Sequence, residues 1–167
     1  MRLDVGAVGK GYATEQAAQL LLSRGVTSYV LNIGGNIRAI GEKVTGEGWI
    51  TGITNPDKTS ANSFVCRVSI KDTSLVTSGD YERYYVVDGK KYHHIIDPKT
   101  LMPATHFSSV SIFTKDSGLA DSLSTALFCM SYEDGLALIE SIGGVEVIWV
   151  YPDGKVVMTD GITLVDG

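Results

Sequence analysis

Short runs of β-branched and aromatic residues, separated by turn-forming residues, make up most of this chain. Such a run, with Gly, Pro, Asn or Asp at its ends, is typical of a β-strand. The pattern predicts strands at residues 29–33, 37–40, 49–54, 64–70, 110–113, 145–151 and 155–158, of which the first is expected to be buried. Because these strands are short and joined by turn signals, we expect a mainly antiparallel sheet.

Residues 77–98 give the most specific local prediction. Asp88-Gly89 separates residues 84–87 from residues 92–96, and an Asp-Gly pair between two β-prone runs is the strongest short-range signal of a hairpin. A Ser-Gly corner precedes this hairpin, and a His-His pair followed by Asp97-Pro98 ends it. Strand ends of this kind can hold a ligand, because the scaffold is rigid while the polar groups stay accessible.

Apolar residues at helical spacing predict three helices. The first covers residues 12–24 and is expected to end at Gly25. A second begins at the capping pair Asp116-Ser117, and a third covers residues 133–142. Between the strands at 29–33 and 37–40, a Gly-Gly pair indicates a bulge or a close backbone approach. We therefore predict one α+β domain, residues 1–167, with helices packed against an antiparallel sheet.

Composition and charge narrow the function classes. With 167 residues, 44% hydrophobic and 20% charged, the chain is long enough for one domain with a core. Its net charge of -5 and pI near 5.1 exclude the basic footprint of a nucleic-acid-binding protein. No apolar run is long enough to span a membrane, and the first residues carry no signal-peptide pattern, so any export signal is expected outside this chain. Cys66 and Cys129 are expected to be buried free thiols.

The glycine-rich opening, residues 4–11, leads directly into the first predicted helix. It is not a Walker A loop, because that motif needs glycine where Asp4 stands and Ser or Thr where Gly11 stands. Backbone N–H groups near a helix N-terminus, together with the cation of Lys10, suit an anion such as a phosphate. A turn with a solvated lysine fits the same residues.

Asp121 and Thr125 lie four residues apart in the second predicted helix, so both oxygens share one helical face. A carboxylate and a hydroxyl at this spacing can hold a hard cation such as Mg²⁺, which usually keeps water and substrate phosphate in its shell. Alternatively, Asp121 favours the dipole of its own helix and Thr125 bonds back to a carbonyl.

Five motifs, taken in order, extend over nearly the whole chain. They are Asp4-x-Gly-Ala7-x-Gly-Lys10-Gly11, Asn32-x-Gly-Gly35, Thr77-Ser-Gly-x-Tyr81, His94-Ile-Ile-Asp97-Pro98 and Ala120-Asp121-x-x-x-Thr125. Together they resemble the FAD:protein FMN transferase family, the ApbE-type flavin transferases. The resemblance implies a T-fold-like α+β domain that binds FAD and a divalent metal, Mg²⁺ or Mn²⁺. It also implies transfer of FMN from FAD to a threonine hydroxyl of an acceptor protein, with release of AMP.

The resemblance also assigns roles to individual residues. The metal ligands would be the backbone carbonyl of Ala7 and the side chains of Asp121 and Thr125. Contacts to the flavin nucleotide would come from Asp4, Lys10, Ser78, His94 and Ile95. His94 would be catalytic, because a neutral imidazole can act as the general base that a weakly nucleophilic threonine hydroxyl needs. Asp97 could orient its ring, whereas His93 is not required by the motif; a strand-end histidine with a purely structural role fits the local sequence as well.

Two departures from the family pattern affect these expectations. The family usually continues its Asp-Pro motif as Lys-Thr-Gly-x-Pro, whereas this chain has Leu101-Met102 before Pro103, so the shape of this loop is open. Members of the family are typically about twice as long. The chain is therefore expected to be the C-terminal portion of a transferase whose N-terminal half supplies part of the flavin pocket. By resemblance, the longer protein is expected to be extracytoplasmic and membrane-anchored, with a membrane-associated redox subunit as its acceptor.

Three functions remain open from the sequence. The first is the FMN transferase, and the second is a metal-dependent FAD pyrophosphatase in which water takes the place of the threonine. The third is a flavin-binding or inert structural domain. Recognition of an acceptor is not written in any motif of the chain, so the sequence does not separate the first function from the second.

Overall fold

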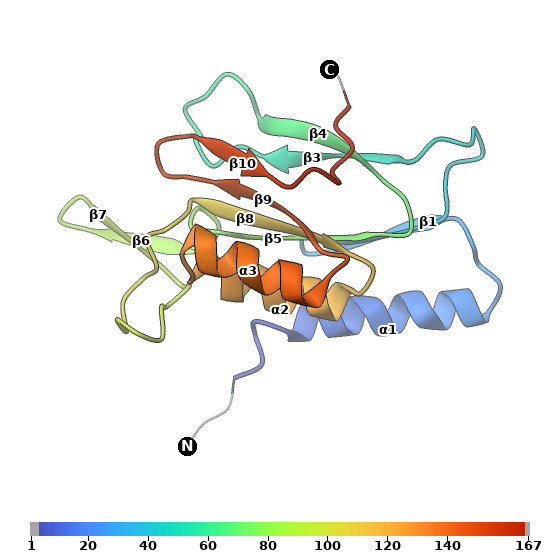
Figure 1. The fold of residues 1–167 in the computed structure, drawn as a ribbon, viewed down its shortest axis with the longest axis horizontal. Helices are drawn as coiled ribbons and strands as arrows, with labels where there is room; N and C mark the ends of the chain where they lie inside the picture. Colours follow the sequence, from blue (N-terminus) through green and yellow to red (C-terminus); the bar gives the residue numbers. More distant parts are fainter. Residues whose placement is uncertain (1–3, 166–167) are drawn as a thin grey trace.

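The computed structural model describes residues 4–165 as an α+β fold built on one antiparallel sheet (Figure 1). The six strands of this sheet lie in the order β1-β2-β5-β8-β9-β10. They are β1 (Tyr29–Ile33), β2 (Asn36–Ile40), β5 (Ser74–Gly79), β8 (Ser109–Thr114), β9 (Glu146–Val150) and β10 (Val156–Met158). Every ladder in the sheet is antiparallel, as the strand lengths and turns predicted.

Three helices cover one face of the sheet, and a two-stranded ribbon covers the other (Figure 1). The helices are α1 (Gly9–Ser23), α2 (Ser117–Phe128) and α3 (Tyr132–Ile142), and the ribbon is formed by β3 (Trp49–Thr54) and β4 (Phe64–Ile70). Successive side chains of a strand point to opposite faces, so β9 sends Val147 and Trp149 into the helical core and Ile148 and Val150 into the core under the ribbon. Burial on both faces explains the uninterrupted apolar run in this part of the sequence.

The helix ends agree with their capping signals. Asp116 is the N-cap of α2, and its carboxylate accepts a hydrogen bond of 2.8 Å from the backbone N–H of Leu119. Ser131 caps α3 in the same way through Asp134 N–H. Helix α1 begins at Gly9, three residues earlier than predicted, and has no side-chain cap of its own.

The central strand β5 was not predicted. Its sequence, Ser-Leu-Val-Thr-Ser-Gly, is rich in residues that usually mark turns, yet it pairs with β2 on one side and β8 on the other. The hydroxyl groups find partners across the sheet and on the helices: Thr77 and Ser111 lie 2.8 Å apart, oxygen to oxygen. Because these polar groups are satisfied, a strand of weak intrinsic propensity is stable in the centre of the sheet.

The strand at residues 29–33 is the edge of the sheet, and its residues are half-buried or exposed, so the expectation of a buried strand was wrong. The glycine pair after it forms a tight turn and not a bulge: Gly34 and Gly35 have φ values of 58° and 90°, and β1 pairs with β2 in register up to Ile33 and Asn36. Positive φ at both central residues of a two-residue turn matches the twist of a hairpin and favours glycine.

The predicted hairpin at Asp88-Gly89 is confirmed, but it is a separate two-stranded sheet that projects from one end of the domain (Figure 1). Its strands are β6 (Tyr84–Val87) and β7 (Lys90–His93), so the second strand ends three residues earlier than predicted. Asp88 and Gly89 both have positive φ, as a type I′ turn requires. This hairpin therefore carries the histidine pair but forms no part of the main sheet.

The two cysteines are free, as predicted, although each is only half-buried. Burial raises the pKa of both thiols, and the nearby carboxylate of Asp97 adds to this effect at Cys129. Among residues 4–165, no helix combines the length and the apolar character that crossing a bilayer requires.

Candidate functional site

The N-termini of α1 and α2 meet at a close crossing of the two helices. The backbone N–H of Gly11 donates a hydrogen bond of 2.7 Å to Oδ2 of Asp121, which lies 110 residues further along the chain. A Cβ atom at Gly11 would lie 3.0 Å from the carbonyl carbon of Ser117 and would overlap its oxygen and the Cβ of Asp121. Only glycine allows this approach, and Asp121 supplies the cap that α1 lacks.

The carboxylate of Asp121 is nearly buried, with 5% of the residue exposed. None of the ion pairs in the described part of the chain involves it, so the positive end of the α1 dipole is the favourable charge it meets. The dipole it caps is therefore that of α1 and not that of its own helix. A carboxylate has two oxygens, and the Gly11 bond uses Oδ2, which leaves Oδ1 for a further partner.

Thr125 lies one turn further along α2, facing the end of strand β5. Its hydroxyl oxygen is 3.4 Å from Oγ of Ser78, and the same Ser78 oxygen is 2.8 Å from Oγ of Ser124. Ser124 in turn donates to the carbonyl of Asp121 at 2.9 Å. The structure thus joins the hydroxyl groups of Thr125, Ser78 and Ser124 into one cluster that reaches the backbone carbonyl of Asp121. No sequence motif pointed to Ser124.

The glycine-rich opening lies next to this cluster through Gly11. Ala7 is in the turn that immediately precedes α1, one helical turn before Gly11, and it is exposed. Lys10 is also exposed, and its Nζ donates to the carbonyl of Gly34 at 3.2 Å, so the first two motifs of the sequence touch. Asp4 is exposed and its carboxylate accepts from the N–H of Gly6 at 2.8 Å, which makes a local turn.

The two histidines at the end of β7 have different environments. His93 is buried; its Nε2 is 2.8 Å from the carbonyl of Ala104 and its Nδ1 accepts from the N–H of Ile95 at 3.3 Å, so both ring nitrogens are used. His94 is exposed, and its Nδ1 lies 3.3 Å from the carbonyl of Arg83. Because a carbonyl only accepts, this contact selects the neutral tautomer in which Nδ1 carries the proton and Nε2 has the lone pair.

The loop after the histidines closes tightly despite its altered sequence. Asp97 N–H bonds to the carbonyl of Met102, and Leu101 N–H bonds to the carbonyl of Asp97, at 2.9 and 2.8 Å. Leu101 has a φ of 58°, a conformation that glycine adopts without strain, so the loop keeps a glycine-like shape with a leucine in it. The Asp97 carboxylate accepts from Lys99 N–H inside this loop, and the partner of the His94 ring is Arg83, not Asp97 as expected.

Not all predicted residues come together. The ring of His93 packs edge-on against Phe128 at the C-terminal end of α2, with 5.6 Å between ring centroids. Phe128 is seven residues beyond Asp121, which is about 10 Å along a helix at 1.5 Å per residue. The histidine pair is therefore at the other end of α2 from the Asp121 carboxylate. Ile95 lies in the helical core, and its N–H and carbonyl are bonded to His93 and Ala104.

The donor types at the crossing fit a hard divalent cation. The Asp121 carboxylate is nearly buried and has no ion-pair partner among the described residues. This carboxylate, the Thr125 hydroxyl and the backbone carbonyl of the exposed residue Ala7 are all oxygen ligands of the kind Mg²⁺ and Mn²⁺ prefer. Within residues 4–165 there is no group of three or more His, Cys, Asp and Glu side chains that could hold a metal. The predicted metal ligands are one carboxylate, one hydroxyl and one backbone carbonyl, so they do not form a group of that kind.

Comparison with known proteins identifies the family of this chain. Residues 1–149 match the model of the ApbE family. The FAD:protein FMN transferase of Treponema pallidum (strain Nichols) is 41% identical over 97% of this chain and 47% of its own length, and that of Klebsiella pneumoniae (strain 342) is 32% identical over 95% and 48%. The chain thus spans about half the length of the curated relatives it matches.

Solved structures show the same fold. The ApbE protein from Thermotoga maritima superposes with a TM-score of 0.86 at 34% identity, over 95% of this chain and 52% of that one. The flavin transferase ApbE from Vibrio cholerae gives a TM-score of 0.76 at 31% identity, over 95% and 50%. The family model, the relatives and the solved structures lead to the same conclusion: the chain belongs to the ApbE family.

Proposed function

We propose that this chain carries the metal- and FAD-binding residues of an enzyme that transfers FMN from FAD to a threonine hydroxyl of an acceptor protein. The relatives named above are FAD:protein FMN transferases, and they match almost the whole chain. The observation that carries the proposal is the Asp121 carboxylate, which is nearly buried, free of ion pairs and held at the N-terminus of α1 beside Lys10. An anion held in this way attracts a cation, and a cation beside a helix N-terminus attracts a pyrophosphate.

The reaction exchanges one phosphorus–oxygen bond for another. The threonine oxygen bonds to the phosphorus on the FMN side of the pyrophosphate, the bond from that phosphorus to the bridging oxygen breaks, and AMP leaves with the bridging oxygen. The hydroxyl proton passes to a base. When bound, Mg²⁺ or Mn²⁺ would neutralise charge on the pyrophosphate oxygens, and Ala7, Asp121 and Thr125 are the residues that would hold it.

His94 is proposed as the base. In the neutral tautomer that donates from Nδ1 to the Arg83 carbonyl, Nε2 has a lone pair. The side chain is exposed, so an incoming hydroxyl can reach it. His93 has both ring nitrogens engaged within the protein and is unsuited to the role. Lys10 would turn from the Gly34 carbonyl to a phosphate oxygen, a better partner for an ammonium group.

The remaining roles follow the resemblance. Asp4 and Ser78 would contact the flavin nucleotide, since both are polar and at least partly exposed. The side chain of Ile95 lies in the core, so its contact with the flavin nucleotide would require a rearrangement of the surface that covers it. The acceptor would be a membrane-associated redox subunit, and the enzyme would act outside the cytoplasm, anchored to a membrane.

The test is to incubate the protein with FAD, Mg²⁺ and a threonine-bearing acceptor, and to follow AMP release and acceptor-bound flavin. We expect both products in equal amounts. Asp121→Asn should abolish calorimetric binding of Mg²⁺ and Mn²⁺, because the variant loses the charge that the hard cation needs. Asp160→Asn, an exposed carboxylate, is the matched control and should bind both metals like the wild type.

Other outcomes identify the alternatives. AMP and free FMN without labelled acceptor would show a pyrophosphatase. FAD binding without either product would show a flavin-binding domain, and unchanged metal affinity in Asp121→Asn would remove the metal site from α2.

A further inference from the structure

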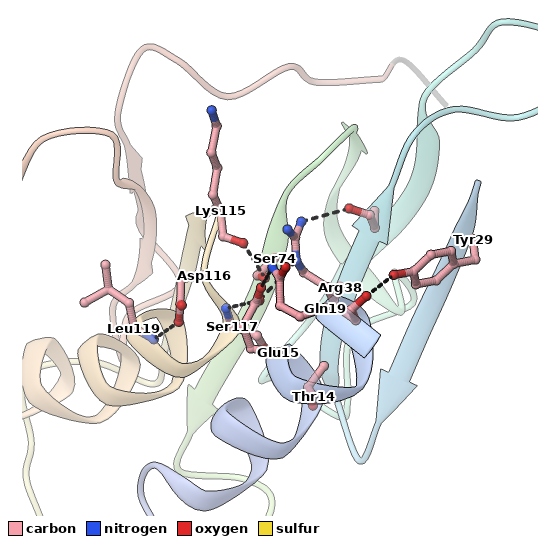
Figure 2. A network of polar contacts seen from close by, with 12 residues as sticks. Thr14, Glu15, Gln19, Tyr29, Arg38, Ser74, Lys115, Asp116, Ser117 and Leu119 are labelled. Carbon is pink, nitrogen blue, oxygen red and sulfur yellow. Dashed lines mark hydrogen bonds and ion pairs between the residues drawn. The ribbon is translucent and has the colours of Figure 1, made fainter. Parts of the chain in front are cut away.

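Glu15 is a buried carboxylate on α1 that none of the roles described above uses. Its Oε2 accepts two hydrogen bonds, one of 3.2 Å from Nε of Arg38 and one of 2.9 Å from the backbone N–H of Ser117 (Figure 2). Its Oε1 accepts a third bond, of 2.7 Å, from Gln19. Both members of the Glu15–Arg38 pair are nearly inaccessible to solvent, so this ion pair is not an ordinary surface contact.

The bond to Ser117 mirrors the bond between Gly11 and Asp121. Ser117 is the first residue of α2, and Glu15 caps its N–H from α1; Asp121 caps the N–H of Gly11 from α2. In each helix the donor and the carboxylate are four residues apart, hence on one face. Each helix thus supplies a carboxylate to the N-terminal turn of the other. The two contacts run in opposite directions along the chain, because Gly11 pairs with Asp121 whereas the later residue Glu15 pairs with the earlier residue Ser117.

Arg38 fixes this pair of caps to the sheet. The side chain comes from β2 and is buried, and its second contact is a bond of 3.0 Å from Nη1 to the carbonyl of Ala39. On the α2 side, Ser74 of β5 donates to the carbonyl of Lys115 at 3.3 Å, while the Lys115 amine extends away from Glu15 (Figure 2). Helix α1 is therefore tied to β2 through Glu15, and the start of α2 is tied to the adjacent strand β5 through Lys115.

We propose that Glu15 is a positioning residue for Asp121. It holds the first turn of α2 against α1, and this sets where Asp121, one turn further on, presents its second oxygen. The inference rests on the proposed metal site and adds to it a residue that does not touch the metal. The charge and the length of the side chain both matter: glutamine loses the charge opposite Arg38, and aspartate is one methylene too short to reach Arg38 and Ser117 together.

The experiment measures Mg²⁺ and Mn²⁺ affinity by calorimetry, well below the melting temperature of each protein. We expect Glu15→Gln to bind about 10- to 100-fold more weakly, the usual effect of losing a residue that orients a metal ligand. Excess metal should restore turnover in Glu15→Gln but not in Asp121→Asn. The matched control is Glu42→Gln, which breaks an exposed ion pair with Lys71 and should bind metal like the wild type.

A second variant tests the same bond from the other side. Ser117→Pro removes the donating N–H at the first position of α2, where proline is tolerated, and the preceding residue already has the extended conformation that proline requires. Its metal affinity should fall as in Glu15→Gln.

The outcomes separate the two proposals. A lowered melting temperature with wild-type metal affinity in either variant would reduce Glu15 to a structural residue and overturn the inference. If the wild type binds neither metal, the proposed metal site is wrong and the positioning role is overturned with it.

Discussion

Replacing Gly11 by alanine tests how closely α1 and α2 must approach. The added methyl would meet backbone atoms of Ser117, 3.0 Å from its carbonyl carbon and nearer still to its oxygen. Backbone atoms inside a helix cannot turn aside as a side-chain tip can, so the two helices must separate. Separation lengthens the bond between Gly11 and Asp121 and the bond between Glu15 and Ser117, which are 2.7 and 2.9 Å long.

The expected change in unfolding free energy is the sum of three effects. Overpacking a close contact costs about 1–3 kcal/mol. Each of the two carboxylate hydrogen bonds contributes about 1.5–3 kcal/mol, and we expect part of that to be lost. Exchanging glycine for alanine in a helix returns about 1 kcal/mol. Gly11→Ala should therefore destabilise the protein by about 2–4 kcal/mol, opposite in sign to helix propensity alone.

Gly135→Ala is the matched control. Gly135 is also helical and buried, but a Cβ there would have Leu127 Cγ as its nearest neighbour at 3.5 Å, an ordinary contact. Helix propensity then dominates, and the variant should gain about 0.5–1 kcal/mol.

Urea unfolding followed by circular dichroism measures both variants, with the midpoint expected to move and the slope to stay constant. Because a domain of this size shifts by about 2–4 °C per kcal/mol, Gly11→Ala should melt roughly 4–16 °C below the wild type. Equal or greater stability of Gly11→Ala would refute the account of the crossing. Equal losses of stability in Gly11→Ala and Gly135→Ala would show that the destabilisation is not specific to the helix crossing.

Three further predictions concern binding, catalysis and pH. Lys10→Ala should weaken FAD binding more than riboflavin binding, because the lysine contacts phosphate and not the flavin ring. Lys115 is also an exposed lysine, and Lys115→Ala should weaken the binding of neither ligand. Equal losses of FAD and riboflavin affinity in Lys10→Ala would exclude a phosphate contact for Lys10. His94→Asn should lower the transfer rate by about 10²- to 10⁴-fold while the fold and metal binding stay intact. His93→Asn should instead lower stability, because the buried hydrogen bonds of His93 are lost. A fully active His94→Asn would show that another residue is the general base. Burial, with smaller contributions from nearby acidic residues, raises the pKa of Tyr81 from 10.0 to about 12. Between about pH 10 and 12 the folded state therefore keeps a proton that the unfolded state releases, and the free energy of unfolding should fall as the pH rises. In Tyr81→Phe this part of a plot of urea midpoint against pH should be flatter, and a plot identical to that of the wild type would show that other groups cause the fall.

Local signals were enough for most elements of the fold. The Asp88-Gly89 turn, the Asp116 cap and the glycine stop after α1 act within a few residues, so their effect can be predicted without knowing the rest of the chain. The same is true of the spacing of Asp121 and Thr125, which the period of a helix places on one face.

Tertiary structure decided what local sequence left ambiguous. Strand β5 is built from residues typical of turns and becomes the centre of the sheet, because its neighbours satisfy its hydroxyl groups and bury its two faces. The strand at residues 29–33 has a buried-strand sequence but lies at the edge, since burial depends on what covers a strand and not on its composition.

The candidate site depends even more on distant contacts. No local motif marks Glu15 as buried, yet it is buried because Arg38 and the N–H of Ser117, 102 residues away, compensate its charge. The sequence by itself determined which oxygen-bearing and cationic groups were available. The crossing of α1 over α2 decided which of these groups come into contact. Gly11 lets the two helix ends approach so closely that a carboxylate of each helix accepts a hydrogen bond from the backbone of the other.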